Sequence, residues 1–303
     1  MLDGAISLAI PTKYGQSLTI EPINESKLIW KSFDEESAIW FEGEFLIDEI
    51  VTSLTPHNDI SNRLIQILNE TKKLNPDFFN TKDGFKVSTS LDFPRVWGLG
   101  TSSTLISNIA QWAHVDAYQL LENTFGGSGY DIACAQHNTP ITYQLNKDEI
   151  LLEQHFDKLS VTPLHDKKRN IIEVNFNPSF KNHLYFVYLN QKQNSRDGIA
   201  QYKNNTSDLT ESISAINTIT QNIISCNTLD EFILLIEQHE NIISKIIKQK
   251  PVKDTLFRDF NGGIKSLGAW GGDFVLVASK GNPETYFKNK GYETIIPYQD
   301  MIL

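Results

Sequence analysis

Hydrophobic and polar positions follow two periods along this chain. In the first pattern, apolar runs or apolar–polar alternation over five to eight residues predict β-strands. The clearest segments of this kind are 16–21, 28–33, 85–91 and 184–189. In the second pattern, apolar residues recur every three or four positions, which predicts amphipathic helices packed on sheets. Segments of this kind are 60–74, 206–226 and 229–248. Strands mixed with helices in this way predict an α/β (α+β) protein.

The same pattern suggests where the chain divides. A polar stretch runs from 146 to about 170 and is broken by Pro163. We therefore expect an N-terminal domain over 1–160 and a C-terminal domain over 161–303, which suits the length of the chain. Within the first domain, we interpret Glu42-Gly43-Glu44 as a turn between two short aromatic-rich strands.

Composition narrows the class of protein. The 303 residues are 40% hydrophobic and 21% charged, as in ordinary globular proteins. The net charge of −10 makes duplex nucleic acid an unexpected partner, because that ligand requires a basic surface. Cys134 and Cys226 are far apart and favour neither a disulfide framework nor a zinc site. No apolar run reaches the roughly 18 residues of a membrane span. We expect a cytoplasmic protein, monomeric or homodimeric, that acts on a small molecule.

The stretch from Pro94 to Ser103 carries the first candidate chemistry. Its sequence P-R-V-W-G-L-G-T-S-S places two glycines before three hydroxyl residues, and an apolar helical run follows. A helix N-terminus offers unpaired backbone N–H groups and the positive end of the helix dipole, which suit a phosphate. The loop is not a Walker A motif, because no G-K-[ST] follows it.

A second glycine-rich turn leads to Asp131. Residues 126–131 read G-G-S-G-Y-D. If this turn converges with the first loop, the pair supplies a phosphate cradle, a hydroxyl for Mg²⁺ and a carboxylate near a reacting hydroxyl. Simpler interpretations remain open: Asp131 and Ser102 as helix caps, and Glu122 as a solvated helix residue.

These residues resemble the GHMP kinases. Pro94 to Ser103 is similar to the family's second motif, P-x-x-x-G-L-G-S-S-A, with Thr101 for the first serine and Ser103 for the alanine. Residues 127–133, G-S-G-Y-D-I-A, resemble the run around the catalytic aspartate of the mevalonate and phosphomevalonate kinases. The GYDIA spelling is typical of a bacterial subgroup of the family.

A third segment, residues 265–273, resembles the family's motif K-x-x-G-A-G-G-G-G. Trp270 and Asp273 stand where that motif has glycines, so this loop is stiffer and more negative. The family's first motif, with a glycine–lysine pair and G-E-x-x-V-x-x-G, is expected upstream of Leu2-Asp3-Gly4 and is not in the printed sequence. Its functional lysine is the main departure from the family pattern.

The resemblance implies a two-domain fold. An N-terminal α/β domain like that of a small-subunit ribosomal protein would bind ATP, and a C-terminal ferredoxin-like domain would pack on it. The residues implied in triphosphate binding are Gly98, Leu99, Gly100, Thr101, Ser102 and Ser103. Ser102 and Glu122 would hold Mg²⁺, and Asp131 would orient or deprotonate the acceptor hydroxyl. Residues implied near substrate or phosphate are Gly268, Ala269, Gly271, Gly272, Ser195 and Arg196, with Lys192 and Lys265 as further candidates.

The resemblance also implies a reaction. It is transfer of the ATP γ-phosphoryl group to a hydroxyl or phosphate acceptor, with mevalonate or phosphomevalonate in isoprenoid synthesis as leading acceptors. Two alternatives remain: a diphosphomevalonate decarboxylase-like enzyme, and a catalytically silent homologue that binds a nucleotide or metabolite as a regulator. The altered third motif and the missing lysine segment favour the silent homologue somewhat.

Overall fold

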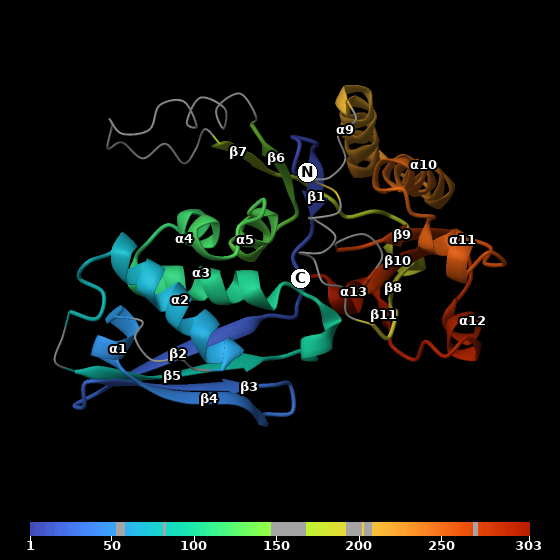
Figure 1. Cartoon of the computed structure of the whole chain (residues 1–303). Helices are drawn as coiled ribbons and strands as arrows, with labels where there is room; N and C mark the ends of the chain where they lie inside the picture. The colour runs from blue at the N-terminus through green and yellow to red at the C-terminus, as the bar shows by residue number, and fades with distance from the viewer. Residues whose placement is uncertain (53–57, 81–82, 147–167, 192–201, 203–207, 269–271) are drawn as a thin grey trace. The chain divides into compact units, whose positions relative to one another are not determined.

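Contacts divide the chain into two compact units in the computed structural model (Figure 1). The structure describes residues 1–303 except 53–57, 81–82, 147–167, 192–201, 203–207 and 269–271. The first unit comprises residues 1–13, 96–98 and 137–303, and the second comprises 14–95 and 99–136. The expected boundary near 160 falls outside the described residues, so the division into 1–160 and 161–303 stays a prediction.

The second unit is a sheet covered by helices. Its strands are β2 (Gln16–Ile23), β3 (Lys27–Phe33), β4 (Ile39–Leu46) and β5 (Gly84–Leu91). They lie in the order β2-β5-β3-β4, with β3 parallel to β5 and the other pairs antiparallel. Its helices are α1 (Ile47–Thr52), α2 (Asp59–Leu74), α3 (Thr101–Ala113), α4 (Ala117–Thr124) and α5 (Tyr130–Ala135).

Alternation along the strands explains this arrangement. In β3, Leu28, Trp30 and Ser32 are buried on one face, with partly exposed residues between them. The buried apolar strand residues join Leu68 of α2 and Ile106 of α3 in one core. The helices thus cover the apolar face of the sheet, as period-two strands and period-3.6 helices require (Figure 1).

The described strands of the first unit form two sheets. One has the order β1-β6-β7 and the other β11-β8-β10-β9, all paired antiparallel. Their strands are β1 (Ser7–Ala9), β6 (Ile141–Leu145), β7 (Arg169–Glu173), β8 (Leu184–Tyr188), β9 (Gly263–Ser266), β10 (Phe274–Ala278) and β11 (Ile295–Pro297). The helices are α9 (Thr210–Ser225), α10 (Leu229–Ile247), α11 (Val252–Leu256), α12 (Glu284–Asn289) and α13 (Tyr298–Met301). Short 3₁₀ turns, η1 (Arg95–Trp97) and η2 (Lys181–His183), precede α3 and β8.

The expected α+β architecture is confirmed, and one local interpretation was wrong. Gly43 is not in a turn: it lies inside β4, opposite Trp30 of β3. The hairpin turn is at Asp34–Ala38, where the Asp34 carboxylate accepts from two backbone amides and Ser37 has φ +61°. Aspartate side chains favour such turns, whereas alternation of buried Phe41 and Phe45 carries the strand through Gly43.

Candidate functional site

The early glycine loop, Gly98–Ser103, leads directly into α3. Gly98 and Gly100 have φ values of +69° and +78°, conformations that favour glycine. Gly100 is the N-cap of α3, and no side chain caps the helix there. The backbone N–H groups of its first turn therefore point out of the helix end, at the positive end of the dipole, and no side chain of the described residues caps them.

The start of α3 is fixed by bonds to β2. The Thr104 hydroxyl donates to the Gln16 side chain at 2.8 Å, and the Asn108 amide donates to the Gln16 carbonyl at 2.8 Å. Ser102 is exposed, and Thr101 and Ser103 are partly exposed. The hydroxyls expected at a phosphate site thus lie at an accessible helix end whose position is set by the sheet.

The second glycine turn brings Asp131 close to this loop. Gly129 has φ +80° and is the N-cap of α5, so Asp131 lies in the first turn and does not cap the helix. A Cβ placed on Gly100 would lie 3.9 Å from the Cβ of Asp131. Among the described residues, the Asp131 carboxylate has neither a hydrogen-bond nor an ion-pair partner. The capping interpretation is therefore wrong, and the carboxylate is available beside Gly100.

The surroundings of Asp131 alter its ionisation. Its side chain is exposed to solvent, yet protein around it removes enough water to raise the pKa of the carboxyl above its ordinary value. Burial, and then the charge of Asp131, raises the pKa of the neighbouring Cys134 thiol to about 12. Cys134 is therefore neutral near pH 7 and unsuited to nucleophilic chemistry.

Ser102 and Glu122 are the predicted magnesium ligands. Ser102 is in the first turn of α3, Glu122 is in the last turn of α4, and both are exposed. The described residues contain no group of three His, Cys, Asp or Glu side chains that forms a metal site by itself. A hydroxyl and a carboxylate still fit Mg²⁺, since this ion takes one or two protein oxygens and completes its shell with water and phosphate.

The late glycine loop connects β9 to β10 and comprises residues 267–273. Of its predicted site residues, Gly268 and Gly272 are described, whereas Ala269 and Gly271 lie outside the described residues. Gly268 has φ +67°, and the Leu267 amide donates to the Phe274 carbonyl at 3.1 Å. Ser195, Arg196 and Lys192 also lie outside the described residues, so their roles stay predictions.

Asp273, at the end of the late loop, packs against Gly98, and both residues belong to the first unit. The Asp273 side chain is only 8% exposed, and a Cβ added to Gly98 would overlap its carboxylate. A Cβ on Gly268 would lie 3.6 Å from the same carboxylate. The Trp97 ring packs edge-on against Phe274, with ring centroids 5.5 Å apart. Residues 96–98 are thereby fixed against the end of β10, and Trp97 serves packing.

Lys265 is not a free cation. Its ammonium group lies 3.3 Å from Oε1 of Glu240 and donates to the Ser266 carbonyl at 3.1 Å. Sequence reasoning missed Glu240 and the contact of Asp273 with Gly98. A signal for Glu240 was present: it falls four residues after Ile236 and eight after Phe232, on the apolar stripe of its helix.

Comparison with known proteins supports the fold. No protein-family model matches the sequence, and no curated protein sequence is similar to it. Among solved structures, a mevalonate kinase is 15% identical with a TM-score of 0.63, covering 97% of this chain and 91% of that one. A Streptococcus pneumoniae phosphomevalonate kinase in complex with phosphomevalonate and AMPPNP is 16% identical with a TM-score of 0.61, covering 94% and 95%.

A Lactococcus lactis galactokinase complexed with galactose is similar as well. It is 11% identical with a TM-score of 0.62, covering 95% of this chain and 83% of that one. The chain therefore has the GHMP kinase fold. At sequence identities this low, the similarity shows the fold alone. Activity and substrate have to be argued from the residues of the site. In the described part of the chain, no helix has the length and apolar character that crossing a membrane requires.

Proposed function

We propose that this protein is an ATP-dependent small-molecule kinase of the GHMP superfamily. The observation that carries the proposal is the approach of Asp131 to Gly100. A helix start without a side-chain cap and a carboxylate without a partner among the described residues lie side by side, which is the pair that phosphoryl transfer to a hydroxyl requires. The fold and the resemblance of three sequence motifs support the same reaction class.

In this proposal, the early glycine loop binds the triphosphate. The first-turn N–H groups of α3 donate to phosphate oxygens, and the missing Cβ at Gly100 lets the phosphates approach the backbone. Ser102 and Glu122 would hold Mg²⁺, which would neutralise charge on the phosphates. Catalysis then rests mainly on position and electrostatics, as is usual for phosphoryl transfer.

Asp131 acts on the acceptor. Its carboxylate accepts the hydrogen bond of the attacking hydroxyl and orients it. It takes the hydroxyl proton as the new bond to the γ-phosphorus forms and the bond from that phosphorus to the ADP oxygen breaks, releasing ADP. The raised pKa of Asp131 makes its carboxylate a stronger base, and a stronger base accepts the proton of the hydroxyl more readily. This role requires the ionised form, so activity is lost when acid protonates Asp131.

We infer mevalonate or phosphomevalonate as the acceptor from the G-S-G-Y-D-I-A segment. The likeness in fold to a mevalonate kinase and a phosphomevalonate kinase is compatible with this choice. Galactose is the ligand of another protein with this fold, so the fold does not select among them. The silent homologue is the second candidate, and Asp273 in place of a motif glycine is the observation that favours it.

An ADP-release assay with a panel of acceptors tests the proposal. The panel contains mevalonate, phosphomevalonate, diphosphomevalonate, homoserine and galactose, each with ATP and Mg²⁺. Turnover with mevalonate or phosphomevalonate is expected. Carbon dioxide release from diphosphomevalonate would indicate the decarboxylase. ATP binding without turnover on any acceptor would contradict the kinase and indicate the silent homologue.

A further inference from the structure

Helix α3 begins without the side chain that holds the start of other long helices in this chain. Asn58, Asp116 and Thr228 cap α2, α4 and α10, each by accepting a hydrogen bond from a backbone amide of the first turn. The N-cap of α3 is Gly100, and no side chain of the described residues caps the helix there. A first turn without a cap opens more readily, because its amides lack a partner.

The first turn of α3 is instead bonded to strand β2 through Gln16. The Thr104 hydroxyl donates to Oε1 of Gln16 at 2.8 Å. It lies farther, 3.1 and 3.3 Å, from the carbonyl oxygens of Thr101 and Gly100. A hydroxyl has one hydrogen to donate, so the shortest contact, to Gln16, is the main bond. Thr104 also closes the turn, since its amide donates to the Gly100 carbonyl at 3.0 Å.

A second bond holds the same helix one turn later. The Asn108 amide donates to the backbone carbonyl of Gln16 at 2.8 Å. Thr104 and Asn108 are four residues apart, so they lie on one face of α3. Two bonds on one face, about 6 Å apart along the helix axis, keep the helix from turning about that axis or sliding along the strand.

Gln16 is itself held by the sheet. It is the first residue of β2 and is paired with the end of β5. The preceding residue, Gly15, donates its amide to the Asp92 carboxylate at 2.5 Å. These residues belong to the second unit, as do Gly100 and Asp131. The bonds therefore run from the sheet through Gln16 to the first turn of α3 inside one compact unit.

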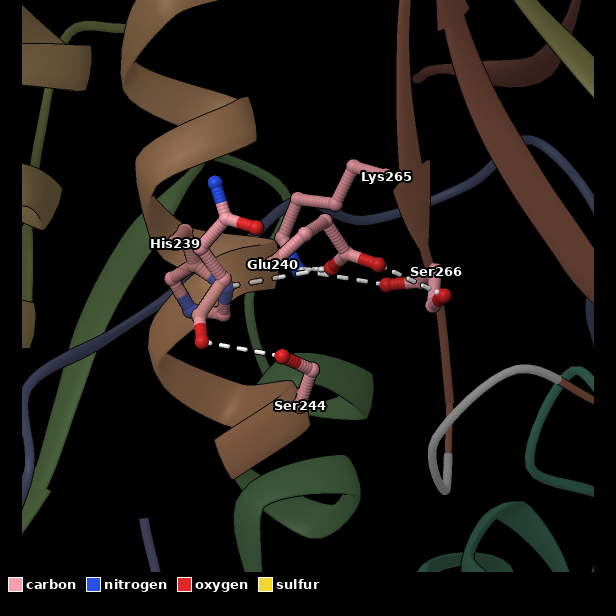
Figure 2. A network of polar contacts seen from close by, with 6 residues as sticks. His239, Glu240, Ser244, Lys265 and Ser266 are labelled. Atoms are coloured by element: carbon pink, nitrogen blue, oxygen red, sulfur yellow. Dashed lines mark hydrogen bonds and ion pairs between the residues drawn. The ribbon is translucent and has the colours of Figure 1, made fainter. Parts of the chain in front are cut away.

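The link between α3 and β2 carries no charge. Figure 2 shows a helix joined to a strand by a carboxylate instead: Glu240 of α10 accepts from the Ser266 hydroxyl at 2.8 Å and lies 3.3 Å from the Lys265 ammonium. An amide oxygen accepts the hydrogen bond of Thr104 without placing a negative charge beside the first turn of α3. Because like charges repel at short range, a neutral acceptor suits a helix start that binds an anion.

We propose that Gln16 is a positioning residue that orders the first turn of α3 in place of a cap and leaves the backbone N–H groups of that turn available to phosphate. A capping side chain would accept from these amides and compete with the ligand. Gln16 accepts from a side-chain hydroxyl, so the turn is held while its amides stay available. The part of this inference that concerns ATP rests on the proposed function.

Four substitutions separate the bond from the charge. Thr104→Val removes the hydroxyl and keeps the branched shape of the side chain, and Thr104→Ser restores the hydroxyl. Gln16→Met removes the amide from an unbranched side chain, and Gln16→Glu keeps an acceptor for Thr104 but adds a negative charge. Thr71→Val is the matched control, because the Thr71 hydroxyl donates at 2.8 Å to the Ile67 carbonyl of its own helix, α2.

Amide hydrogen exchange of the full chain without ATP measures the order of the first turn. The amides of residues 104–106 report on it, because in an α-helix they donate to the carbonyls of residues 100–102. Their exchange is expected to be about threefold faster in Thr104→Val and Gln16→Met, since losing a hydrogen bond favours the open turn. It is expected to match the wild type in Thr104→Ser, Gln16→Glu and Thr71→Val.

Isothermal titration with ATP and Mg²⁺ measures the consequence for binding. The Kd is expected to rise about threefold in Thr104→Val, in Gln16→Met and in the variant with both changes, because the two changes remove the same bond. Gln16→Glu is expected to raise the Kd at least as much through charge repulsion, with normal exchange. Thr104→Ser and Thr71→Val are expected to keep the wild-type Kd. In Thr104→Val the KM for ATP is expected to rise by the same factor as the Kd, with kcat changed less than about twofold.

The outcomes separate this inference from the proposed function. Exchange and Kd in Thr104→Val equal to those in Thr71→Val would overturn the inference. A double variant in which the two losses multiply would also overturn it, because the two residues would then act independently. If circular dichroism shows that substitutions at one residue unfold the protein, those at the other decide by the same readouts. A wild type that binds no ATP would overturn the proposed function, and the exchange data would still decide whether Gln16 orders the first turn.

Discussion

Gly98 combines two constraints at a single residue. Its φ of +69° favours glycine, and its missing side chain leaves the space that the Asp273 carboxylate occupies. Gly126 has a similar φ of +66°, but an added Cβ there meets no atom within 4 Å. The two glycines therefore share the backbone requirement and differ in packing.

Gly98→Ala is expected to lower the free energy of unfolding by about 3 kcal/mol, from backbone strain and overlap with a buried carboxylate. Gly126→Ala, the control, is expected to cost about 1 kcal/mol from the backbone alone. Urea denaturation of the two variants and the wild type measures both values. Equal losses would show that the contact with Asp273 adds nothing.

At the scale of elements, helix α3 differs from helix α4. Asp116 caps α4 by accepting from the Gln119 amide at 2.7 Å, whereas α3 begins at Gly100 without a side-chain cap. A negative charge in the first turn stabilises any helix through the dipole. In α3 such a charge also occupies the place proposed for phosphate, so stability and ligand affinity are expected to change in opposite directions.

Ser102→Asp is accordingly expected to raise the free energy of unfolding by about 0.5 kcal/mol. It is expected to weaken ATP binding by at least about tenfold through like-charge repulsion. Gln119→Asp adds the same charge to the first turn of α4, at an exposed residue, and is expected to leave ATP affinity unchanged. Thermal unfolding and isothermal titration measure the two effects. Equal ATP affinity in both variants would contradict a phosphate site at α3.

How far the sequence predicted these elements depends on the reach of the interactions. Helices α3 and α4 follow from apolar spacing and a capping aspartate, which are local signals, and both are confirmed. Gly43 was misassigned because a glycine between two glutamates has the local composition of a turn, whereas pairing with β3 decides its conformation. The partner of Lys265 was missed since Glu240 is 25 residues away, and only tertiary packing brings them together.

The candidate site shows the same limit. The glycines, the hydroxyl residues and Asp131 were found from short motifs. The sequence alone could not show whether the two glycine-rich turns lie close together. The structure shows that Gly100 and Asp131 do. Asp273 and Gly98 are 175 positions apart in the sequence (273 − 98), yet they are in contact. No local sequence pattern predicts a contact over that separation.

At the scale of the whole molecule, buried ionisable groups couple stability to pH. Burial, and then the charge of Lys265, lowers the pKa of His239 from 6.5 to about 4. The folded protein therefore keeps His239 neutral over a range in which the unfolded chain protonates it. Its contribution to stability is complete above pH 6.5 and is lost as the pH falls toward 4. The lowered pKa of Glu240 extends this loss to more acidic pH.

Urea denaturation at pH 7 and pH 5 measures the effect. The wild type is expected to lose on the order of 2 kcal/mol more stability between these values than His239→Gln, in which that titration is absent. Glu240, Lys265 and the chain's amino terminus are the other charged groups that act on His239. Parallel losses in the two proteins would show that His239 is not held neutral by the fold.

In the proposed reaction, Asp131 acts on an acceptor beside a triphosphate bound at Gly100. Asp131→Asn tests it most directly, because the amide keeps the shape of the side chain and removes the base. We expect kcat for ADP release to fall at least about a hundredfold. ATP affinity by isothermal titration is expected to stay within about twofold of the wild type, since Asp131 is not a phosphate ligand in this account. A variant with a near-normal rate would contradict the assignment, and so would one that loses ATP binding together with activity.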